Sequence, residues 1–400
     1  MRVAAIGGGM IMQDQILPSL YQLERLGRVG DISVCARNAS TLEALAAHPP
    51  IVEAFPGHSF TPHAGDYRDL LKRLPPRQLV VIALPDSLHY EVVMAALAAD
   101  QHVLCVKPLV LRAAESVEIE VEARRRGLLV AIEYHKRFDD RSLMARRMYR
   151  QGAFGEFRLG NACLHEKWHY RHSNFQNWFT PEQSDAFTYI GCHYVDLVHF
   201  ITGLRPSSVS VYGIKDRFPN GVEGYLWADA RVIWENGACL SVQTSLSYPQ
   251  EGPGSNLQGL TMFMTGSSEP RPQGAVCAGA GAMIRHSDQY RGLEYVDRAG
   301  YSEPSPDYFR YVDCGHGLEP VGYGYRSIEQ IVAAVHDLES GRVSLDHLDA
   351  AGIIATPANS RFNELTVEAG RLSLVNNGRE ALIDYETKSV ALRSVSGTKL

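Results

Sequence analysis

The segment Arg2-Val-Ala-Ala-Ile-Gly-Gly-Gly-Met-Ile-Met12 decides the fold. Its first five residues predict a buried strand, and the amphipathic stretch that ends near Leu26 predicts a helix. Gly7 permits a tight turn between them, and Gly9 lets the backbone approach a pyrophosphate resting on the first amides of the helix. Met12 stands at the third position of this pattern, where Gly or Ala is usual, so we expect looser packing of helix against strand there.

The pattern of strand, loop and helix then repeats along the first third of the chain. Apolar runs that predict further strands alternate with helix-like stretches, and they lie at residues 31–36, 78–83, 101–106 and 128–133. Such alternation is typical of a doubly wound parallel sheet. We therefore expect an α/β dinucleotide-binding Rossmann domain over residues 1–137.

The residue after the second strand bears on the choice of cofactor. A dinucleotide fold usually has an acidic residue there that binds the adenosine ribose, whereas this chain has Arg37. A guanidinium can bind a 2′-phosphate, which favours NADP, or it can stack on adenine, which leaves NAD acceptable. The cofactor is accordingly expected to be NAD or NADP, and a surface turn residue without a ligand remains the alternative for Arg37.

Lys107 follows the run that predicts the fifth parallel strand. An ammonium at the carboxyl end of this strand, beside a nicotinamide, can bind a substrate hydroxyl and stabilise the alkoxide that forms during oxidation. A lone lysine at a strand end is more often a solvated edge charge. Its neighbours in the sequence are therefore needed to interpret it.

Those neighbours resemble the glucose-fructose oxidoreductase and inositol dehydrogenase family. The resemblance rests on the glycine turn, on the loop Ala83-Leu-Pro-Asp-Ser-Leu-His89, on Cys105-Val-Lys-Pro108 and on Glu133-Tyr-His-Lys-Arg-Phe138. The family usually has glutamate before Lys-Pro, and Val106 stands there in this chain. The resemblance implies that the residues in contact with the cofactor are Gly7, Gly9, Met10, Ile11, Arg37, Leu84, Pro85, His89, Lys107 and Pro108.

A helix that begins near residue 189 carries the strongest downstream element of the resemblance. Tyr189, His193 and Asp196 are spaced by four and three residues and are expected to share one helix face. The resemblance implies that His193 is the acid/base next to Lys-Pro, with Tyr189 where the family usually has aspartate. The expected catalytic residues are thus Lys107, His193 and Tyr189, and a buried structural role is the alternative for the histidine.

Residues 165–179 are dense in aromatic rings, imidazoles and amides. Indole rings can stack on the apolar faces of a sugar while polar groups bind its hydroxyls, which suggests Trp168 and Trp178 as platforms. The same composition suits a subunit interface, and that alternative stays open. The expected substrate-binding residues are Lys107, His135, Trp168, Tyr189 and His193. No metal site is expected, because neither cysteine nor clustered carboxylates accompany the histidines.

The remainder of the chain, residues 138–400, predicts an α+β domain with a large, open, mostly antiparallel sheet. Strand-like runs occur at 157–163, 207–213, 226–234 and 238–244, and helix-like runs at 325–336 and 357–374. Two glycine-rich interruptions, 250–256 and 266–281, are expected to be loops. Open sheets of this kind pair face to face, so we expect a homo-oligomer, a dimer or tetramer, formed through this sheet.

Composition excludes several classes of protein. A hydrophobic content of 45% in 400 residues permits two domains, and a net charge of -6 gives no basic surface for nucleic acid. The seven cysteines are scattered without disulfide or Cys-x-x-Cys spacing. Neither a signal peptide nor an apolar run long enough to span a membrane is expected, and the predicted location is cytoplasmic.

The sequence thus predicts an NAD(P)-dependent oxidoreductase that transfers hydride between the nicotinamide and a secondary hydroxyl of a sugar, glycoside or cyclitol. One alternative is a redox-neutral, glycoside-cleaving enzyme with tightly bound NAD. Another is a non-catalytic sugar or dinucleotide sensor of the same fold. Retention of Lys107 and His193 argues against a sensor, while Val106 and Tyr189, where acidic groups are usual, argue mildly for one.

Overall fold

A computed structural model describes residues 1–266, 281–287, 292–296, 300–302, 307–315 and 317–394. The chain forms two compact units, each built from separate stretches of sequence. The first unit contains residues 1–110, 114–139 and 306–361, and the second contains 111–113, 140–305 and 362–400. The expected domain limit after residue 137 stays a prediction, and most of the expected loop at 266–281 lies outside the described residues.

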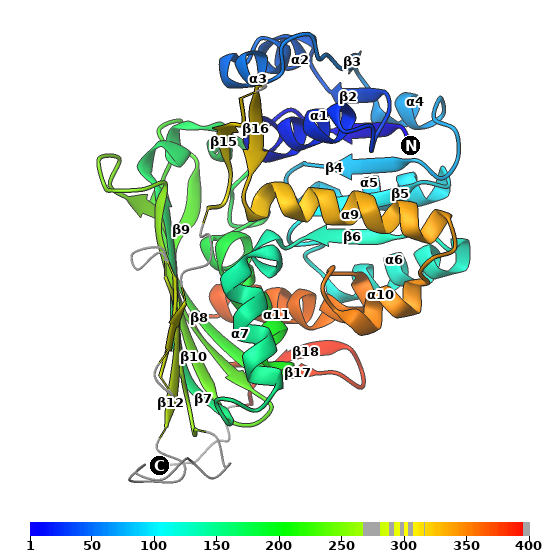
Figure 1. Ribbon diagram of the computed structural model, residues 1–400. Helices are drawn as coiled ribbons and strands as arrows, with labels where there is room; N and C mark the ends of the chain where they lie inside the picture. The colour runs from blue at the N-terminus through cyan, green and yellow to red at the C-terminus, as the bar shows by residue number, and fades with distance from the viewer. Residues whose placement is uncertain (267–280, 288–291, 297–299, 303–306, 316, 395–400) are drawn as a thin grey trace, which may run out of the picture. The chain divides into compact units, whose positions relative to one another are not determined.

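The sheet of the first unit has six parallel strands in the order β3-β2-β1-β4-β5-β6. They are β1 (Val3–Ile6), β2 (Ile32–Ala36), β3 (Thr61–Ala64), β4 (Leu79–Ile82), β5 (His102–Val106) and β6 (Val130–Glu133). All residues of β1, β4, β5 and β6 are buried, which explains why these strands read as continuous apolar runs. The predicted doubly wound sheet is confirmed, with the strand order of a Rossmann fold (Figure 1).

Helices of the first unit come from both ends of the chain. They are α1 (Leu17–Arg25), α2 (Ala39–Ala46), α3 (Pro49–Ala54), α4 (Tyr67–Leu71), α5 (His89–Ala98), α6 (Ala113–Arg126), α9 (Tyr323–Glu339) and α10 (Leu345–Ala351). The short helices η2 (Asp86–Leu88) and η3 (His135–Phe138) follow β4 and β6, and the hairpin β15 (Arg310–Asp313) and β16 (Leu318–Val321) precedes α9. Apolar side chains of α9, from Ile328 to Val335, join α1 and the sheet in one core. The first unit is therefore completed by residues late in the sequence.

The helix after the glycine turn begins differently from the expectation. Residues Met12–Ile16 form a π turn, η1, before the regular helix α1 starts. Pro18 lies in the first turn of α1, where it has no N–H to donate to Asp14 and its ring would crowd that carbonyl in a regular α-helix. In the π turn the hydrogen bonds reach back five residues instead of four, as from the Leu17 amide to the Met12 carbonyl. Met12 is fully buried in the core at the start of this turn.

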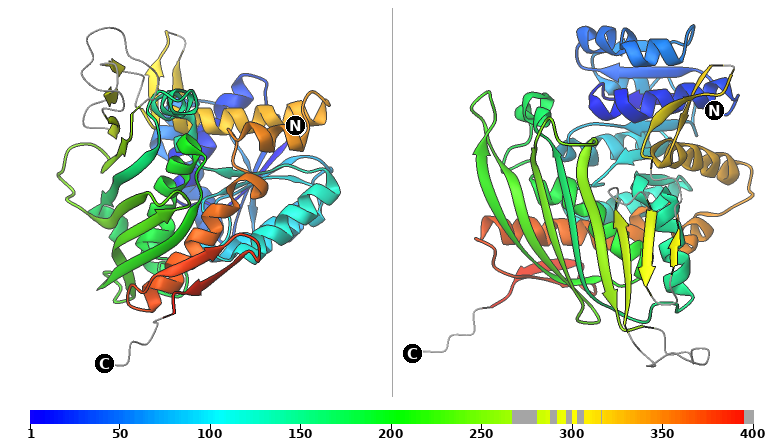
Figure 2. Two further views of the ribbon diagram at one scale, coloured as in Figure 1. Left: turned by 90° about the horizontal axis from the view of Figure 1, so that it is seen from below. Right: turned by 60° about the vertical axis from the view of Figure 1, so that its left-hand side comes forward.

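The second unit contains a sheet of ten strands in the order β14-β13-β12-β11-β7-β10-β9-β8-β17-β18. They are β7 (Phe157–Lys167), β8 (Pro206–Arg217), β9 (Glu223–Trp234), β10 (Cys239–Tyr248), β11 (Asn256–Met264), β12 (Ala282–Ser287), β13 (Gly292–Val296), β14 (Gly300–Ser302), β17 (Ala381–Asp384) and β18 (Ser389–Leu392). Neighbouring strands are antiparallel except β7 and β10, which are parallel. The predicted open, mostly antiparallel sheet is confirmed (Figure 2).

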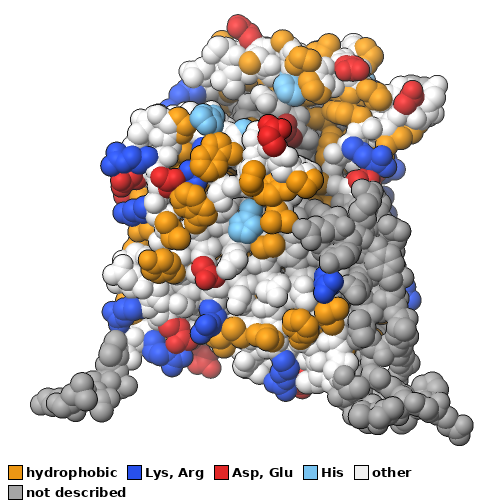
Figure 3. All heavy atoms as spheres, turned by 90° about the vertical axis from the view of Figure 1, so that its left-hand side faces the viewer, with side chains coloured by type: hydrophobic (Ala, Val, Ile, Leu, Met, Phe, Trp, Pro, Cys, Tyr) orange, Lys and Arg blue, Asp and Glu red, His pale blue; other side chains and the backbone are white. Residues whose placement is uncertain are grey.

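The two faces of this sheet differ. Helices α7 (Asp140–Arg150), α8 (Cys192–Thr202) and α11 (Pro357–Val375), with the π turn η6 (Phe187–Gly191), cover one face. The opposite face, here called the outer face, carries none of the described α-helices. Its exposed apolar side chains include Leu159, paired with Phe263, and Tyr212, paired with Asp229. Figure 3 shows hydrophobic side chains on this face, with charged and histidine side chains among them.

Candidate functional site

The glycine turn after β1 has the shape that a dinucleotide requires. Gly7 has φ +116°, and a Cβ built there would lie 2.1 Å from the carbonyl oxygen of Ala83, so only glycine fits. A Cβ on Gly9 would meet nothing within 4 Å, and the space beside this residue is open. The amides of Met12 and Gln13 bond to the Gly9 carbonyl as the helix begins. This open turn at a helix N-terminus fits a pyrophosphate.

The remaining expected cofactor contacts lie at the carboxyl ends of neighbouring strands. Met10 and Ile11 are half-buried at the start of the helix, and Leu84 and Pro85 are half-buried after β4. Arg37, directly after β2, is exposed and has no ion pair with any residue that the structure describes. It is accordingly available to an anionic group of a ligand. The roles of these residues stay predictions.

Lys107 directly follows β5 and is joined to Pro108 by a cis peptide bond. Its side chain is largely buried, with 8% of the residue exposed. The carbonyl of Pro108 lies 2.8 Å from Nδ1 of His89, and Nε2 of the same ring lies 2.8 Å from the carbonyl of Leu84. His89 is fully buried and connects the loops that follow β4 and β5.

A buried carboxylate, Glu133, ends the neighbouring strand β6. Its Oε1 accepts hydrogen bonds from Gln15 Nε2 (2.8 Å) and Ser327 Oγ (2.6 Å), and its Oε2 lies 2.9 Å from Nδ1 of His135. Gln15 belongs to the π turn and in turn accepts from the hydroxyl of Tyr308. Glu133 therefore holds His135, an expected substrate contact, in a defined orientation. Glu133 and Gln15 were not predicted as site residues, although a carboxylate at the end of an apolar strand was a usable signal.

In the second unit, His193 and Asp196 lie in α8 with exposed fractions of 6% and 1%. Tyr189 lies one turn earlier, inside the π turn η6, where the amide of Cys192 donates to the carbonyl of Phe187 five residues before it. The wider turn changes the rotation per residue at Tyr189, and the sharing of one helix face by Tyr189, His193 and Asp196 stays a prediction.

The ring of Tyr189 packs in an aromatic cluster with residues of the 165–179 segment. Its centroid is 5.0 Å from Phe175, 5.7 Å from Trp178 and 6.0 Å from Phe179. The contacts with Phe175 and Phe179 are edge-on, the preferred geometry for aromatic pairs. Trp178, one of the two expected sugar platforms, is thus a neighbour of Tyr189.

Trp168, the other expected platform, lies in a different environment. The Arg171 guanidinium is stacked between the rings of Trp168, 4.0 Å away, and Trp227, 4.5 Å away. Arg171 also donates to Asp216, whose pKa it lowers. Trp227 belongs to the outer face of the sheet, because Leu226 and Ala228 on either side of it are buried beneath the helices. The structure therefore associates Trp168 with the outer face.

The structure assigns the predicted residues to two groups. The first unit holds Gly7, Gly9, Met10, Ile11, Arg37, Leu84, Pro85, His89, Lys107, Pro108 and His135, and the second holds Trp168, Tyr189 and His193. Within the first unit all of them lie at the carboxyl ends of strands β1, β2, β4, β5 and β6. This is the edge at which open parallel sheets bind ligands.

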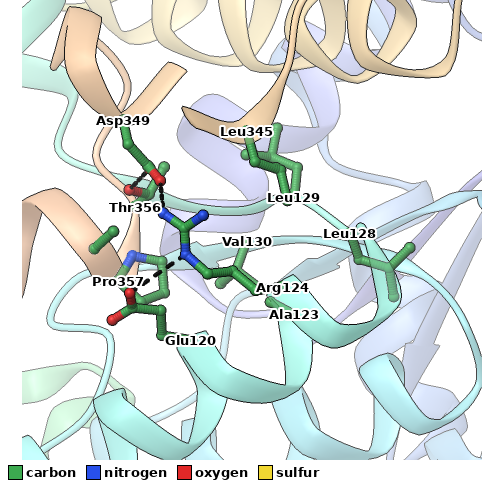
Figure 4. Close-up of a pocket in the computed structure, with 11 residues that line it drawn as sticks. Glu120, Ala123, Arg124, Leu128, Leu129, Val130, Leu345, Asp349, Thr356 and Pro357 are labelled. Carbon is green, nitrogen blue, oxygen red and sulfur yellow. Dashed lines mark hydrogen bonds and ion pairs between the residues drawn. The ribbon is translucent and has the colours of Figure 1, made fainter. Parts of the chain in front are cut away.

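A pocket of about 270 Å³, including its open mouth, lies at the amino end of β6, away from these residues (Figure 4). It is bordered by α6, α10 and the start of α11. Arg124 crosses it and pairs with Glu120, Asp346 and Asp349. The guanidinium is thus already neutralised by carboxylates, and we assign no ligand to this pocket.

The described residues contain no group of three or more His, Cys, Asp or Glu side chains that could hold a metal ion. Among the same residues, no helix combines the length and the apolar character that crossing a bilayer demands.

Comparison with known proteins identifies the family. Residues 1–134 match an oxidoreductase family with an NAD-binding Rossmann fold, and residues 142–265 match the GFO/IDH/MocA C-terminal domain. The chain belongs to the GFO/IDH/MocA oxidoreductase family. The resemblance inferred from the glycine turn and the Lys-Pro motif is thereby confirmed, as is a nicotinamide dinucleotide as the cofactor class.

Individual members of the family are only distantly similar to this chain. An uncharacterised oxidoreductase of Schizosaccharomyces pombe is 32% identical over 134 residues, covering 33% of this chain and 36% of its own. The scyllo-inositol 2-dehydrogenase (NADP(+)) of Bacillus subtilis is 25% identical over 138 residues, which cover 34% of this chain and 37% of the relative. The chain thus spans about a third of the length of these curated relatives. The solved structure of a levoglucosan dehydrogenase in complex with NADH has a TM-score of 0.67 at 18% identity, covering 94% of this chain and 98% of its own, which shows a common fold.

Proposed function

We propose that this GFO/IDH/MocA protein is an NAD(P)-dependent dehydrogenase that oxidises a secondary hydroxyl of a sugar, glycoside or cyclitol. The observation that carries the proposal is Lys107, held at the carboxyl end of β5 in a unit that matches an NAD-binding family. The similarity to a scyllo-inositol 2-dehydrogenase and to the structure of a levoglucosan dehydrogenase supports this substrate class.

The residues of the first unit have definable tasks in this reaction. The turn at Gly7 and Gly9 would bind the pyrophosphate, and Arg37 would bind the adenosine end of the cofactor. When bound, the nicotinamide supplies the hydride acceptor. Lys107 would bind the reacting hydroxyl and stabilise negative charge on its oxygen. His135, oriented by Glu133, would bind a further substrate hydroxyl.

The residues of the second unit would supply the base and substrate recognition. We propose His193 as the acceptor of the hydroxyl proton, because a neutral imidazole can take a proton near pH 7. Tyr189 and the neighbouring ring of Trp178 would contact the substrate. The outer face, with Leu159, Phe263 and Trp168, is proposed as the surface on which two copies associate.

A screen of sugars, glycosides and inositols tests the proposal. Each compound is incubated with the purified protein and NAD or NADP. Formation of the reduced cofactor is followed by its absorbance at about 340 nm, and the products are identified in parallel. Net reduced cofactor, lost in Lys107→Ala and His193→Ala, supports the dehydrogenase. Glycoside cleavage without net reduced cofactor would establish the redox-neutral alternative, and sugar binding without any turnover would establish a sensor.

A further inference from the structure

His89 is the first residue of α5, and its imidazole is completely buried. Both ring nitrogens face backbone carbonyl oxygens, Nδ1 that of Pro108 and Nε2 that of Leu84, each at 2.8 Å. The two carbonyls follow neighbouring strands, β4 and β5, which pair in parallel with Ile82 opposite Cys105. One side chain thus joins the loops at the ends of two adjacent strands.

The chemistry of the two contacts explains how the ring is held. A carbonyl oxygen only accepts hydrogen bonds, so the imidazole is held by donating an N–H. Its two nitrogens face one carbonyl oxygen on each side, both at 2.8 Å. The ring therefore spans the distance between the two loops, and a shift of either carbonyl would displace it.

We propose that His89 is a positioning residue that joins Leu84 to Pro108 and thereby holds Lys107 in place. Lys107 lies between the end of β5 and the carbonyl that His89 binds, so a shift of this carbonyl moves the backbone of the lysine. The role of Lys107 rests on the proposed function. The geometry favours backbone support over the cofactor contact expected from the sequence, because both nitrogens are engaged and no part of the residue is exposed.

Nuclear magnetic resonance tests the hydrogen bonding of the ring without any substrate. The protein is prepared with ¹⁵N-labelled histidine, and the His89 signals are assigned by their absence in His89→Gln. We expect a His89 ring N–H signal that is protected from exchange with water, because this N–H is buried and bonded to a carbonyl oxygen. A ring N–H that exchanges as fast as that of an exposed histidine would overturn the proposal, and because the wild-type protein is observed, this result does not depend on the variant's stability or on turnover.

The positioning of Lys107 is measured separately. Lysines are reductively methylated with ¹³C-formaldehyde, and the Lys107 dimethylamine signal, assigned with Lys107→Arg, is compared in wild type, His89→Gln and His89→Phe. His102→Gln is the matched control, since His102 is another fully buried histidine but lies at the opposite end of β5. We expect the signal to move in the His89 variants and to stay in the control. An unmoved signal contradicts the positioning role.

Kinetics separates positioning from cofactor binding once the screen has found a substrate. In His89→Gln we expect kcat to fall about tenfold, with the Kd for NAD(P)H, measured by its fluorescence, changed less than about twofold. A parallel loss of cofactor affinity would make His89 a cofactor ligand and overturn the proposal. If the screen finds no substrate, the proposed function fails while the two resonance experiments still decide the role of His89.

Discussion

At the scale of single residues, Lys107 and His193 are the strongest candidates for chemistry. Replacing either by alanine should lower kcat about a hundredfold or more, because each removes a group that handles charge or a proton in the transition state. The double variant should be little worse than the poorer single variant, since groups that act on one hydroxyl are not additive. Steady-state assays with the substrate from the screen measure this.

Retained cofactor binding is the control for that prediction. Fluorescence titration of both variants with NAD(P)H should give Kd values within about threefold of wild type. Near-normal turnover in either variant would contradict the pairing and leave the sensor as the better explanation.

Arg37 allows a prediction about the adenosine end of the cofactor. An exposed guanidinium without an ion pair among the described residues can form charge-assisted bonds to a 2′-phosphate. Arg37→Asp should therefore lower NADP affinity and shift the ratio of NADP to NAD affinity about tenfold or more toward NAD. Parallel titrations with both cofactors give the ratio, and an unchanged ratio would show that Arg37 does not bind the ribose.

The sequence indicated these residues because each carries a local signal, such as a strand end or a departure from a motif. It did not indicate Gln15 or Glu133, because their partners Ser327 and Tyr308 are about three hundred positions from Gln15 in the chain. A buried hydrogen-bond network leaves no periodicity that sequence inspection can detect. His89 was recognised as part of a loop motif, but its contacts with two carbonyls became visible only in the folded chain.

At the scale of elements, two substitutions in the glycine turn should have different effects, one on stability and the other on cofactor binding. Gly7→Ala should destabilise the protein by roughly 2–5 kcal/mol, because the new methyl would overlap the Ala83 carbonyl at a φ of +116°. Gly9→Ala should change stability by less than about 0.5 kcal/mol, since its Cβ meets nothing within 4 Å. The same methyl should nonetheless weaken NAD(P) binding about tenfold by occupying the space of the pyrophosphate.

Urea unfolding and cofactor titration of the two variants test this distinction. If Gly9→Ala binds NAD(P) as tightly as wild type, the glycine turn does not contact the cofactor. A Gly7→Ala variant as stable as wild type would show that the turn tolerates a side chain.

His102 in strand β5 should make the stability of the protein depend on pH. Burial lowers the pKa of His102, although the nearby Glu339 carboxylate acts in the opposite direction. Its Nδ1 accepts from the amide of Leu129 (3.0 Å), which requires the unprotonated nitrogen. A histidine whose folded pKa is lowered binds protons more readily when unfolded, so the free energy of unfolding should fall as the pH drops below the unfolded value of about 6.5.

His102→Gln should flatten this part of the pH profile in urea unfolding between about pH 7 and 5.5. The half-buried His165, whose pKa is also lowered by desolvation, provides the comparison, because His165→Gln should flatten the profile in the same sense. A wild-type profile without slope in this range would contradict the assignment.

Element types were predictable where the residues form a continuous apolar run, as in β1 and β4. The two π turns were not, because they depend on particular crowding. At η1 the proline of the first α1 turn excludes a regular helix. Strand β7 runs to Lys167, beyond the expected end at residue 163, since its later residues are stabilised by partners in β10 and β11. Pairing of this kind overrides local propensity.

At the scale of the whole molecule, the two tryptophans of the 165–179 segment should have separate functions. Trp178→Ala should weaken sugar binding, because Trp178 packs on Tyr189. Trp168→Ala should instead weaken self-association, because Trp168, 42% exposed, stacks on Arg171 at the outer face. Calorimetric titration with sugar and analytical ultracentrifugation, each applied to both variants, measure these effects.

Leu159→Ala serves as an outer-face control, since this side chain is 54% exposed and pairs with Phe263. It should reduce self-association as Trp168→Ala does. If Trp168→Ala loses sugar binding but keeps its self-association, Trp168 contacts the substrate. That result would contradict the prediction that the two tryptophans have separate functions.

The late position of helix α9 in the sequence affects how the first unit packs during synthesis. During synthesis the ribosome releases all six strands of the first sheet long before residues 323–339 emerge. Until then the apolar surface that later contacts Ile328, Ile331 and Val332 remains uncovered on the nascent chain. We therefore expect the amino-terminal unit to stay incompletely packed, and in need of chaperone protection, until residues 323–339 have left the ribosome.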